Sequence, residues 1–280
     1  MLGGRMKYVV CAGALLDEQL YNYIQTVTGI HIIQGYGLTE GLAVLQSLNK
    51  KKYSCGTCMN GMEIKLVDVP KMNYYTSKRC GEILIRGKNV FQGYYNDKEE
   101  TNNAFDKDGY FITGDIGRVD KNNAITIIDR KKDIFKLAQG EYICPSKIQE
   151  AYKSYIPLKD VYVHGENQKS FLVAIGFFEL SSIAAWCKNN FSDCNFGEDL
   201  SLQEAEKILN SAPAYKFLCN DLESTARDYN LKGFEMVKAW HFKCEIPTVE
   251  NKLLTSTLKH KRFAFEERFS KEFENLYAKC

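Results

Sequence analysis

The stretch HIIQGYGLTE, residues 31–40, decides the fold because a β-branched run is followed at once by glycine, tyrosine, glycine, threonine and glutamate. This composition predicts a strand that ends in a tight, polar turn. Upstream, KYVVC predicts a buried strand, and apolar residues from Leu16 to Val27 recur at helical spacing until Gly29. Strand, helix and strand predict a parallel crossover unit, in which ligands lie beyond the carboxyl ends of the strands.

The overall composition limits the classes of protein to consider. With 280 residues, 45% of them hydrophobic, the chain can bury a substantial core and form two domains. A net charge of +2 provides no overall attraction to nucleic acid, and we expect no such partner. No apolar run approaches the roughly 20 residues that span a bilayer, and MLGGRMKYVV does not read as a signal peptide. We therefore expect an intracellular protein.

Closely spaced cysteines can indicate a metal site. Cys55 and Cys58 have metal-like spacing in SCGTCMNG, but no second pair or nearby histidines accompany them. We expect no zinc site there, and free thiols throughout, because the other cysteines are scattered among apolar patterns.

The pattern changes along the chain and predicts α/β and α+β classes. From about Glu63, the runs EIKLVDV, GEILIRG and AITIIDR alternate without a convincing helix between them, which predicts a small β-barrel-like subdomain. After DRKKDIFK, Pro145 begins a predicted helix, followed by the strands VYVHG and SFLVAIGFF and by amphipathic helices. We expect an α/β remnant over 1–55, a β-rich subdomain over 56–132 and a second, α+β domain over 133–280.

The last predicted helix, about 260–277, carries four phenylalanines among many charges. We expect an aromatic face packed on the domain, made of Phe263, Phe265, Phe269 and Phe273.

Two segments at neighbouring strand ends, CAGALL and GYGLTE, have the composition of a nucleotide site. Their glycines allow close backbone approach, and Tyr36 offers a face for stacking a flat ring. Thr39 offers a hydroxyl and an amide to a phosphate, and Glu40 can bind Mg²⁺.

Three later charged segments suit the same ligand, although each has a plainer interpretation. Asp115 in GDIG can accept both ribose hydroxyls, or be a turn aspartate. Arg130 can clamp ribose or phosphate while Lys132 lies at a pivot, or both can belong to a solvated linker. In NKLLTSTLKHKR, lysines such as Lys259 precede a helix start that disfavours cations, which indicates an anionic ligand.

These motifs, in this order, resemble the carboxyl-terminal part of the long-chain fatty-acid–CoA ligases of the adenylate-forming (acyl-CoA synthetase) superfamily. The resemblance also covers GKNVFQGYYND, DKDGYFITGDIG, IIDRKKDIFKLAQGEYICPSKI and VHGE. It implies a mobile C-terminal domain and roles for matching residues. The implied nucleotide contacts are Gly13, Ala14, Tyr36, Gly37, Thr39, Asp115 and Arg130. The implied catalytic residues are Lys259, Thr39 and Glu40, with Glu40 as the Mg²⁺ ligand, Lys132 as the hinge and Gly140 in a CoA-channel loop.

The resemblance also implies a reaction in two steps. A fatty carboxylate attacks the α-phosphate of ATP to give acyl-AMP and pyrophosphate, and the CoA thiol then takes the acyl group and releases AMP. A large rotation about Lys132 separates the steps. The implied ligands are fatty acid, ATP or AMP, Mg²⁺ and CoA, and the implied location is the cytoplasm or the cytoplasmic face of an internal membrane.

Two departures from the family pattern bear on these expectations. Ser256 stands where the family usually has proline, which should loosen the lysine loop. The family's phosphate loop and the first half of its nucleotide domain are absent from the sequence. We expect the isolated chain to be inactive and to need the N-terminal half, through which membrane association could also occur.

Three functions remain open at this level. The chain is a fragment of a fatty-acid–CoA ligase, a non-catalytic nucleotide-binding or interaction relative, or part of an adenylating ligase for another carboxylic acid. The segments IFKLAQGEY and VHGE favour the long-chain members.

Overall fold

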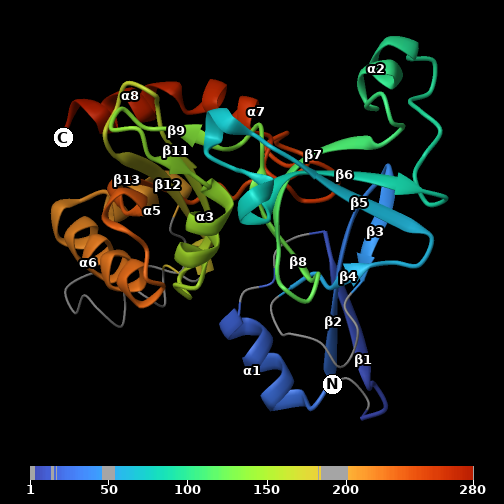
Figure 1. The fold of residues 1–280 in the computed structure, drawn as a ribbon. Coiled ribbons are helices and arrows are strands. Elements are labelled where there is room, and N and C mark those ends of the chain that lie inside the picture. Colours follow the sequence, from blue (N-terminus) through green and yellow to red (C-terminus); the bar gives the residue numbers. More distant parts are fainter. Residues whose placement is uncertain are drawn as a thin grey trace. The chain divides into compact units, whose positions relative to one another are not determined.

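The computed structural model describes residues 4–13, 16, 18–45, 54–181, 183 and 201–279. The chain divides into two compact units, Met1–Lys132 and Asp133–Cys280. Figure 1 shows the elements of both units in sequence colours. Among the described residues, no helix combines the length and the apolar character needed to cross a bilayer.

The first sheet of unit 1 contains a parallel crossover, as predicted. Its order is β1-β2-β3-β4, and the parallel pair β1 and β2 sets Tyr8 opposite His31. The helix α1 connects these two strands. The elements of this part are β1 (Tyr8–Ala12), α1 (Glu18–Thr28), β2 (His31–Leu38), β3 (Gly41–Leu45) and β4 (Thr57–Cys58).

The turn predicted after β2 forms at Thr39 and Glu40, but the strand itself is longer than HIIQ. It continues through the glycines to Leu38 and pairs with the antiparallel strand β3. Glycine is needed here, since a Cβ on Gly37 would meet the Cα of Leu42 at 2.9 Å. The motif is therefore the end of a paired strand, held close to its neighbour.

The second sheet of unit 1 is a four-stranded antiparallel sheet in the order β5-β6-β7-β8. In the described part of the chain it is open rather than a closed barrel. One cluster of buried side chains joins the two sheets, with Tyr36 and Val44 from the first and Ile83 and Phe111 from the second. The strands are β5 (Met62–Val67), β6 (Cys80–Gly87), β7 (Phe111–Val119) and β8 (Ile125–Arg130), with short 3₁₀ turns at Pro70–Met72 and Thr76–Lys78.

The expectation of no helix in this region was wrong, because α2 (Lys98–Asn103) lies between β6 and β7. Asp97 caps it by accepting a hydrogen bond from the Glu100 amide at 2.9 Å. The helix buries none of its residues. It therefore gives no apolar periodicity from which a sequence could predict it.

Unit 2 is built on a three-stranded sheet in the order β11-β12-β13. β11 and β12 are antiparallel, whereas β12 and β13 are parallel. The strands are β9 (Phe135–Lys136) and β10 (Tyr142–Ile143), which form a hairpin, and β11 (Leu158–His164), β12 (Leu172–Phe178) and β13 (Val237–Lys243). The helices are α3 (Pro145–Lys153), α5 (Leu202–Leu209), α6 (Ala212–Asp228), α7 (Arg262–Arg268) and α8 (Ser270–Ala278), with a 3₁₀ turn at Gly233–Glu235.

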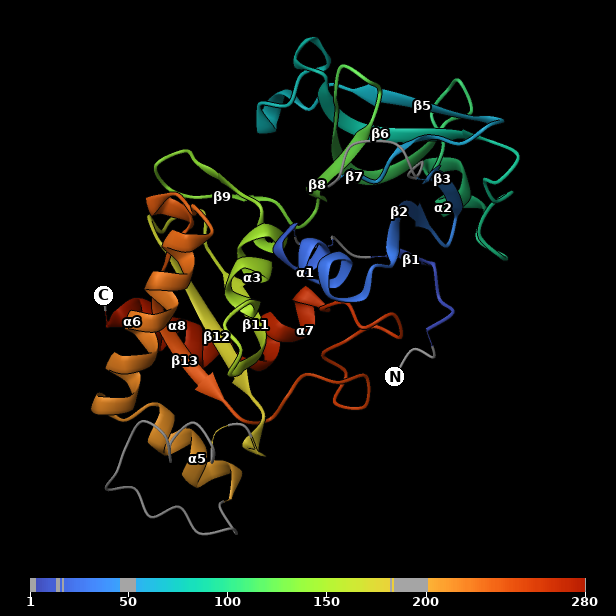
Figure 2. The ribbon, with the colours of Figure 1, turned by 90° about the horizontal axis from the view of Figure 1, so that it is seen from below.

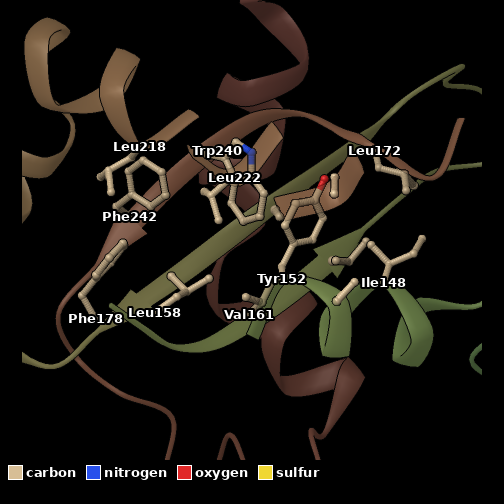
Figure 3. Packing of buried hydrophobic residues seen from close by; sticks show 14 of the residues in the cluster. Ile148, Tyr152, Leu158, Val161, Leu172, Phe178, Leu218, Leu222, Trp240 and Phe242 are labelled. Atoms are coloured by element: carbon tan, nitrogen blue, oxygen red, sulfur yellow. The ribbon is translucent and has the colours of Figure 1, made fainter. Parts of the chain in front are cut away.

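Both faces of this sheet are covered. On one face, residues of α3, α5 and α6 pack with Val161 and Trp240 of the sheet, as Figure 3 shows for the centre of this core. On the other face, Tyr162 and Phe177 pack with residues of α7 and α8. Figure 2 shows β12 and β13 between these groups of helices. All of β12 is buried, so the continuous apolar run that predicted this strand reflects burial on both faces.

The predicted C-terminal helix is two helices, α7 and α8, which meet at Phe269. Phe265, Phe269 and Phe273 are buried in the core, as expected. Phe263 is 79% exposed, so its predicted place on the buried face was wrong. It lies two residues before Phe265, and residues so spaced do not share a helix face.

A close approach ties the hairpin of unit 2 to its sheet. Gly165, directly after β11, lies against the ring of Phe135 in β9, and a Cβ at this position would collide with that ring. The absence of a side chain at Gly165 thus lets Phe135 cover the end of β11.

Candidate functional site

Three predicted residues of unit 1 lie together. The Tyr36 hydroxyl donates a hydrogen bond to Asp115 Oδ2 at 2.6 Å, and Arg130 Nε lies 3.4 Å from Asp115 Oδ1. Tyr36 is in β2, and Asp115 and Arg130 are paired residues of β7 and β8. Sequence segments about 80 residues apart are thereby joined by one carboxylate.

A hydrogen bond to Thr113, a residue that the sequence analysis did not single out, helps to fix the backbone of Asp115. Its backbone amide donates to Thr113 Oγ1 at 3.1 Å, and the Thr113 hydroxyl donates to the Ile83 carbonyl at 2.7 Å. Thr113 is buried, as are Asp115 and Tyr36. The alternation of FITGD offered one signal, since Thr113 and Asp115 are two residues apart and share a strand face.

The electrostatics keep the tyrosine in its donor form. Burial raises the pKa of Tyr36 far above its ordinary value, and the negative charge of Asp115 raises it further. Tyr36 therefore stays protonated, and its hydroxyl consistently donates to the carboxylate. Half of the Arg130 side chain remains exposed beside this pair, with 51% of its surface accessible.

The turn after β2 is also held by unit 1. The Phe91 amide donates to the Glu40 carbonyl at 2.8 Å, and the Tyr94 hydroxyl donates to Glu40 Oε1 at 2.9 Å. Partial burial, together with the Glu40 carboxylate, raises the pKa of Tyr94 to about 12. Thr39 is exposed beside it. Tyr94 lies in GYYND, a segment that shares the family resemblance, although the resemblance implies no role for this residue.

Glu40 has the donor chemistry for magnesium. The described residues contain no cluster of three or more His, Cys, Asp or Glu side chains that could hold a metal. Mg²⁺, however, is commonly bound by one or two carboxylates together with substrate phosphates and water. A single carboxylate next to an exposed threonine fits that kind of site.

The remaining nucleotide candidates are only partly described. Gly13 follows β1 with φ of +90°, a conformation that favours glycine, and its neighbour Ala12 pairs with Gly35 of β2. Gly13 therefore lies close to the strand that carries Tyr36. Ala14 lies outside the described residues.

The segment at the boundary of the units is fixed on its N-terminal side. Lys131 Nζ lies 2.7 Å from Glu82 Oε2, and the Lys131 amide donates to the Gly114 carbonyl at 2.8 Å. Ile134, two residues past the exposed Lys132, is buried. Lys132 thus lies between two anchored positions, a placement that suits a pivot.

The loop with Gly140 is well anchored within unit 2. The Gly140 amide donates to the Leu137 carbonyl at 2.9 Å, and its φ is +94°. The Ala138 amide donates to the Lys169 carbonyl at 3.0 Å, which ties the loop to the turn before β12. Gly140 itself is at the tip of the β9–β10 hairpin.

Lys259 belongs to a tight loop of unit 2. The Thr255 amide donates to the Lys259 carbonyl at 2.8 Å, and the Lys259 amide donates to Thr255 Oγ1 at 3.0 Å. Leu258 has φ of +59°, an unusual value for a branched residue. Lys259 itself is exposed. The loop therefore holds the backbone of Lys259 and presents its side chain to solvent.

The sequence of the first unit matches a known family. Residues 1–95 match the model of the AMP-binding enzymes, which includes the turn after β2 but not Asp115 or Arg130. This match assigns residues 1–95 to the class of AMP-binding enzymes, and the Tyr36–Asp115–Arg130 cluster lies in the same unit.

Within that class, the chain corresponds to the carboxyl-terminal part of the long-chain fatty-acid–CoA ligases. It is 36% identical over 99% of its length to long-chain-fatty-acid–CoA ligase 6 of Rattus norvegicus, and equally so to ligase 1 of Homo sapiens. It spans 39% of the length of either relative.

The fold is shared with an adenylation domain of known structure. The A domain of a carboxylic acid reductase from Segniliparus rugosus, solved with AMP and a co-purified carboxylic acid, aligns with a TM-score of 0.80. Identity is 26%, and the alignment covers 99% of this chain and 40% of that one. The predicted mixed α/β and α+β fold class is thereby confirmed.

Proposed function

We propose that this chain is the carboxyl-terminal part of an AMP-forming ligase that joins long-chain fatty acids to CoA. The observation that carries the proposal is the cluster of buried Tyr36 and Asp115 with half-exposed Arg130, which presents a ring, a carboxylate and a guanidinium together. The similarity to fatty-acid–CoA ligases over 99% of the chain supports the substrate class.

In the proposed nucleotide site, Tyr36 stacks on adenine and Asp115 accepts the ribose hydroxyls. Ionised Asp115 offers lone pairs on both oxygens, of which the Tyr36 bond uses one. Arg130 then donates to ribose or phosphate from its exposed side. Gly13 and Gly37 let the backbone come close to the base and the α-phosphate. The family resemblance implies that Ala14 also lies beside the base.

In the proposed first step, the fatty carboxylate oxygen bonds to the α-phosphorus and pyrophosphate leaves, which yields acyl-AMP. Thr39 contacts the α-phosphate, Glu40 would hold Mg²⁺, and Lys259 donates to oxygens that gain negative charge. Bound Mg²⁺ would supply charge neutralisation at the phosphates. Tyr94 keeps the Glu40 carboxylate in position.

In the proposed second step, the CoA sulfur bonds to the acyl carbon, AMP leaves and the thiol proton is released. The residues 133–280 form the mobile domain, which rotates about Lys132 between the steps. The Gly140 loop then borders the pantetheine channel. The protein acts in the cytoplasm or on the cytoplasmic face of an internal membrane.

The test uses the complete enzyme, meaning this chain supplied with the N-terminal part that its relatives possess. We expect pyrophosphate release that depends on both ATP and a long-chain fatty acid, and that falls sharply in Asp115→Ala. The 280-residue chain alone should bind AMP weakly and release no pyrophosphate, because it lacks a loop for the β- and γ-phosphates.

The outcome separates the alternatives. Nucleotide binding without any acid-dependent turnover would support a non-catalytic relative. Turnover with short or aromatic acids but not with fatty acids would support a ligase for another acid. Robust fatty-acid activation by the 280 residues alone would contradict the fragment interpretation.

The hinge has a test of its own. Lys132→Pro in the complete enzyme fixes φ at the pivot and should slow thioester formation more than adenylation. The control is Lys121→Pro, because Lys121 lies in an exposed turn. Lys136→Pro would disturb the strand β9 and is less well matched. Equal thioester formation in Lys132→Pro and the parent protein would place the pivot elsewhere.

A further inference from the structure

The residue after Lys259 is held by both of its ring nitrogens. His260 Nε2 lies 2.7 Å from Asp160 Oδ2, and His260 Nδ1 lies 2.9 Å from Gln149 Nε2. An amide nitrogen can only donate, so Nδ1 accepts from Gln149 and the proton on Nε2 is donated to Asp160. His260 thus connects the lysine loop to α3 and to β11.

The partners of His260 are themselves fixed. Gln149 is buried on α3, and the Asp160 side chain is only 13% exposed. Lys153 Nζ lies 2.9 Å from Asp160 Oδ1, on the other oxygen of the carboxylate. The imidazole also lies against the Phe265 ring, with centroids 4.8 Å apart. These contacts define one orientation for the ring.

The backbone carries this restraint into the loop. Leu254 and His260 form an isolated antiparallel bridge, and the Lys261 amide donates to the Leu253 carbonyl at 2.9 Å. Leu253 and Leu254 are both buried, so the loop is closed at its base on a fixed platform. Within the loop, the backbone amide and carbonyl of Lys259 are both bonded to Thr255.

We propose that His260 is a positioning residue that sets the orientation of Lys259 through its two bonds to Gln149 and Asp160. The inference rests on the proposed role of Lys259 in acyl-AMP formation. His260 itself does not contact substrate. It limits the conformations of the Lys259–His260 peptide. Its side chain therefore affects the step that uses Lys259 and leaves the other step unchanged.

Side-chain replacements can remove the two bonds separately. In the complete enzyme, His260→Gln retains a donor at about the place of Nε2 and so can keep the Asp160 bond, whereas His260→Asn can keep the bond at the Nδ1 position. His260→Ala removes both. His241→Ala is the matched control, since His241 is a partly buried histidine on β13, outside the lysine loop.

We expect His260→Ala to lower kcat for acyl-AMP formation about 10- to 100-fold, the loss that a displacement of about 1 Å can cause. KM for ATP and thioester formation from supplied acyl-AMP should not change. Hydrogen exchange read by mass spectrometry should be faster for peptides covering 255–259. His260→Gln and His260→Asn should each restore part of the loss, and His241→Ala should resemble the parent.

A double variant tests the route of the effect. In a Lys259→Ala background, His260→Ala should cause little further loss of adenylation, because the residue it positions is gone. A full additional loss, or equal losses in both half-reactions, would overturn the proposal. Unchanged exchange at 255–259 in His260→Ala would also overturn it.

The same measurements separate this proposal from the proposed function. If Lys259→Ala leaves adenylation intact, the catalytic assignment of Lys259 fails and His260 has no step to serve. If Lys259→Ala slows adenylation but His260→Ala does not, the function stands and the positioning role is refuted. If His260→Ala does not fold, the His260→Gln and His260→Asn variants decide the question. The positioning role is refuted if neither variant slows adenylation.

Discussion

The central sheet of unit 2 and the first sheet of unit 1 differ in how well their strands are covered. Every residue of β12 is buried, between one hydrophobic cluster on each face. In β1, by contrast, Tyr8 is 52% exposed and Val10 is 63% exposed. β1 is also an edge strand of the described sheet. Unit 2 therefore contains its own core, whereas the first sheet of unit 1 has apolar surface that a further part of the protein could cover.

The helix α1 of unit 1 also has exposed apolar side chains. The sequence predicted one apolar stripe along it, yet Leu20 and Val27 are exposed, at 47% and 64%. Tyr21, which is outside that stripe, is buried instead. The stripe on α1 is therefore exposed apolar surface of unit 1, as β1 is. The two units thus differ: unit 2 has a self-contained core, and unit 1 carries most of the proposed nucleotide contacts.

The largest effect should come from the core of unit 2. Phe242→Ala removes a fully buried ring beside Trp240 and should lower the free energy of unfolding by about 3–5 kcal/mol. The matched change in β1, Val10→Ala, should cost less than about 0.5 kcal/mol in the 280-residue chain, because Val10 is exposed. Denaturant unfolding measures both, and similar losses would break the comparison.

The next effect concerns the cation that unit 2 contributes. Lys259→Ala in the complete enzyme should slow acyl-AMP formation by about 3 kcal/mol, or roughly 100-fold, as expected when one charge-stabilising donor is lost. Thioester formation from supplied acyl-AMP should be nearly unaffected. Separate assays of the two half-reactions measure this, with Lys271→Ala, an exposed lysine on α8, as control. Equal losses in both assays would contradict the division of steps.

A somewhat smaller effect should follow from the nucleotide contacts of unit 1. Asp115→Ala removes the acceptor for Tyr36 and for ribose, and should weaken AMP binding to the complete enzyme by about 1.5–3 kcal/mol. Asp108→Ala, at an exposed turn of the same unit, should leave affinity unchanged. Titration calorimetry gives both constants. If Lys259→Ala weakened AMP binding as much as Asp115→Ala, the contrast between the units would be lost.

The smallest effect is a pH dependence in unit 2. Burial alone would raise the pKa of Asp160, but the bond from His260 and the charge of Lys153 outweigh it, so the pKa lies below its ordinary value. A lowered folded-state pKa stabilises the protein above the unfolded pKa of about 4, and this stabilisation is lost as pH falls through the folded pKa.

The matched variant isolates this carboxylate. Asp160→Asn should make the acid side of the stability curve shallower, by at most about 1.4 kcal/mol per pH unit below about pH 4. Asp228→Asn, an exposed change on α6, should leave the slope as it is. Urea unfolding at several pH values measures the slope, and identical curves for Asp160→Asn and the parent would refute the assignment.

The parts of the fold that sequence could predict are those with regular periodicity. The β1–α1–β2 crossover came from helical spacing between two short apolar runs, and β12 came from its continuous apolar run. The predicted burial of β1 was wrong, since the strand is largely exposed, and Asp115 lies inside β7 rather than in a turn. The helix α2 could not be predicted in this way, because it is fixed by the Asp97 cap and buries nothing.

For the site, residue chemistry predicted which side chains to consider but not how they are supported. The bonds of Thr113 to the Ile83 carbonyl and of Tyr94 to Glu40 join residues that are far apart in sequence. Glu40 and Tyr94 are 54 positions apart, so no local pattern signals that contact. Placement of Phe263 failed for a local reason, since a residue two positions before Phe265 does not share its helix face.

The contact between Gly165 and Phe135 has a consequence for how this protein can change over evolutionary time. A methyl group at residue 165 has no room while the ring of Phe135 covers it, and a smaller side chain at 135 would leave a gap above glycine. The two positions are therefore expected to be inherited as a pair. A lineage that acquires alanine at 165 should already carry a smaller residue at 135, because the opposite order would first create a clash.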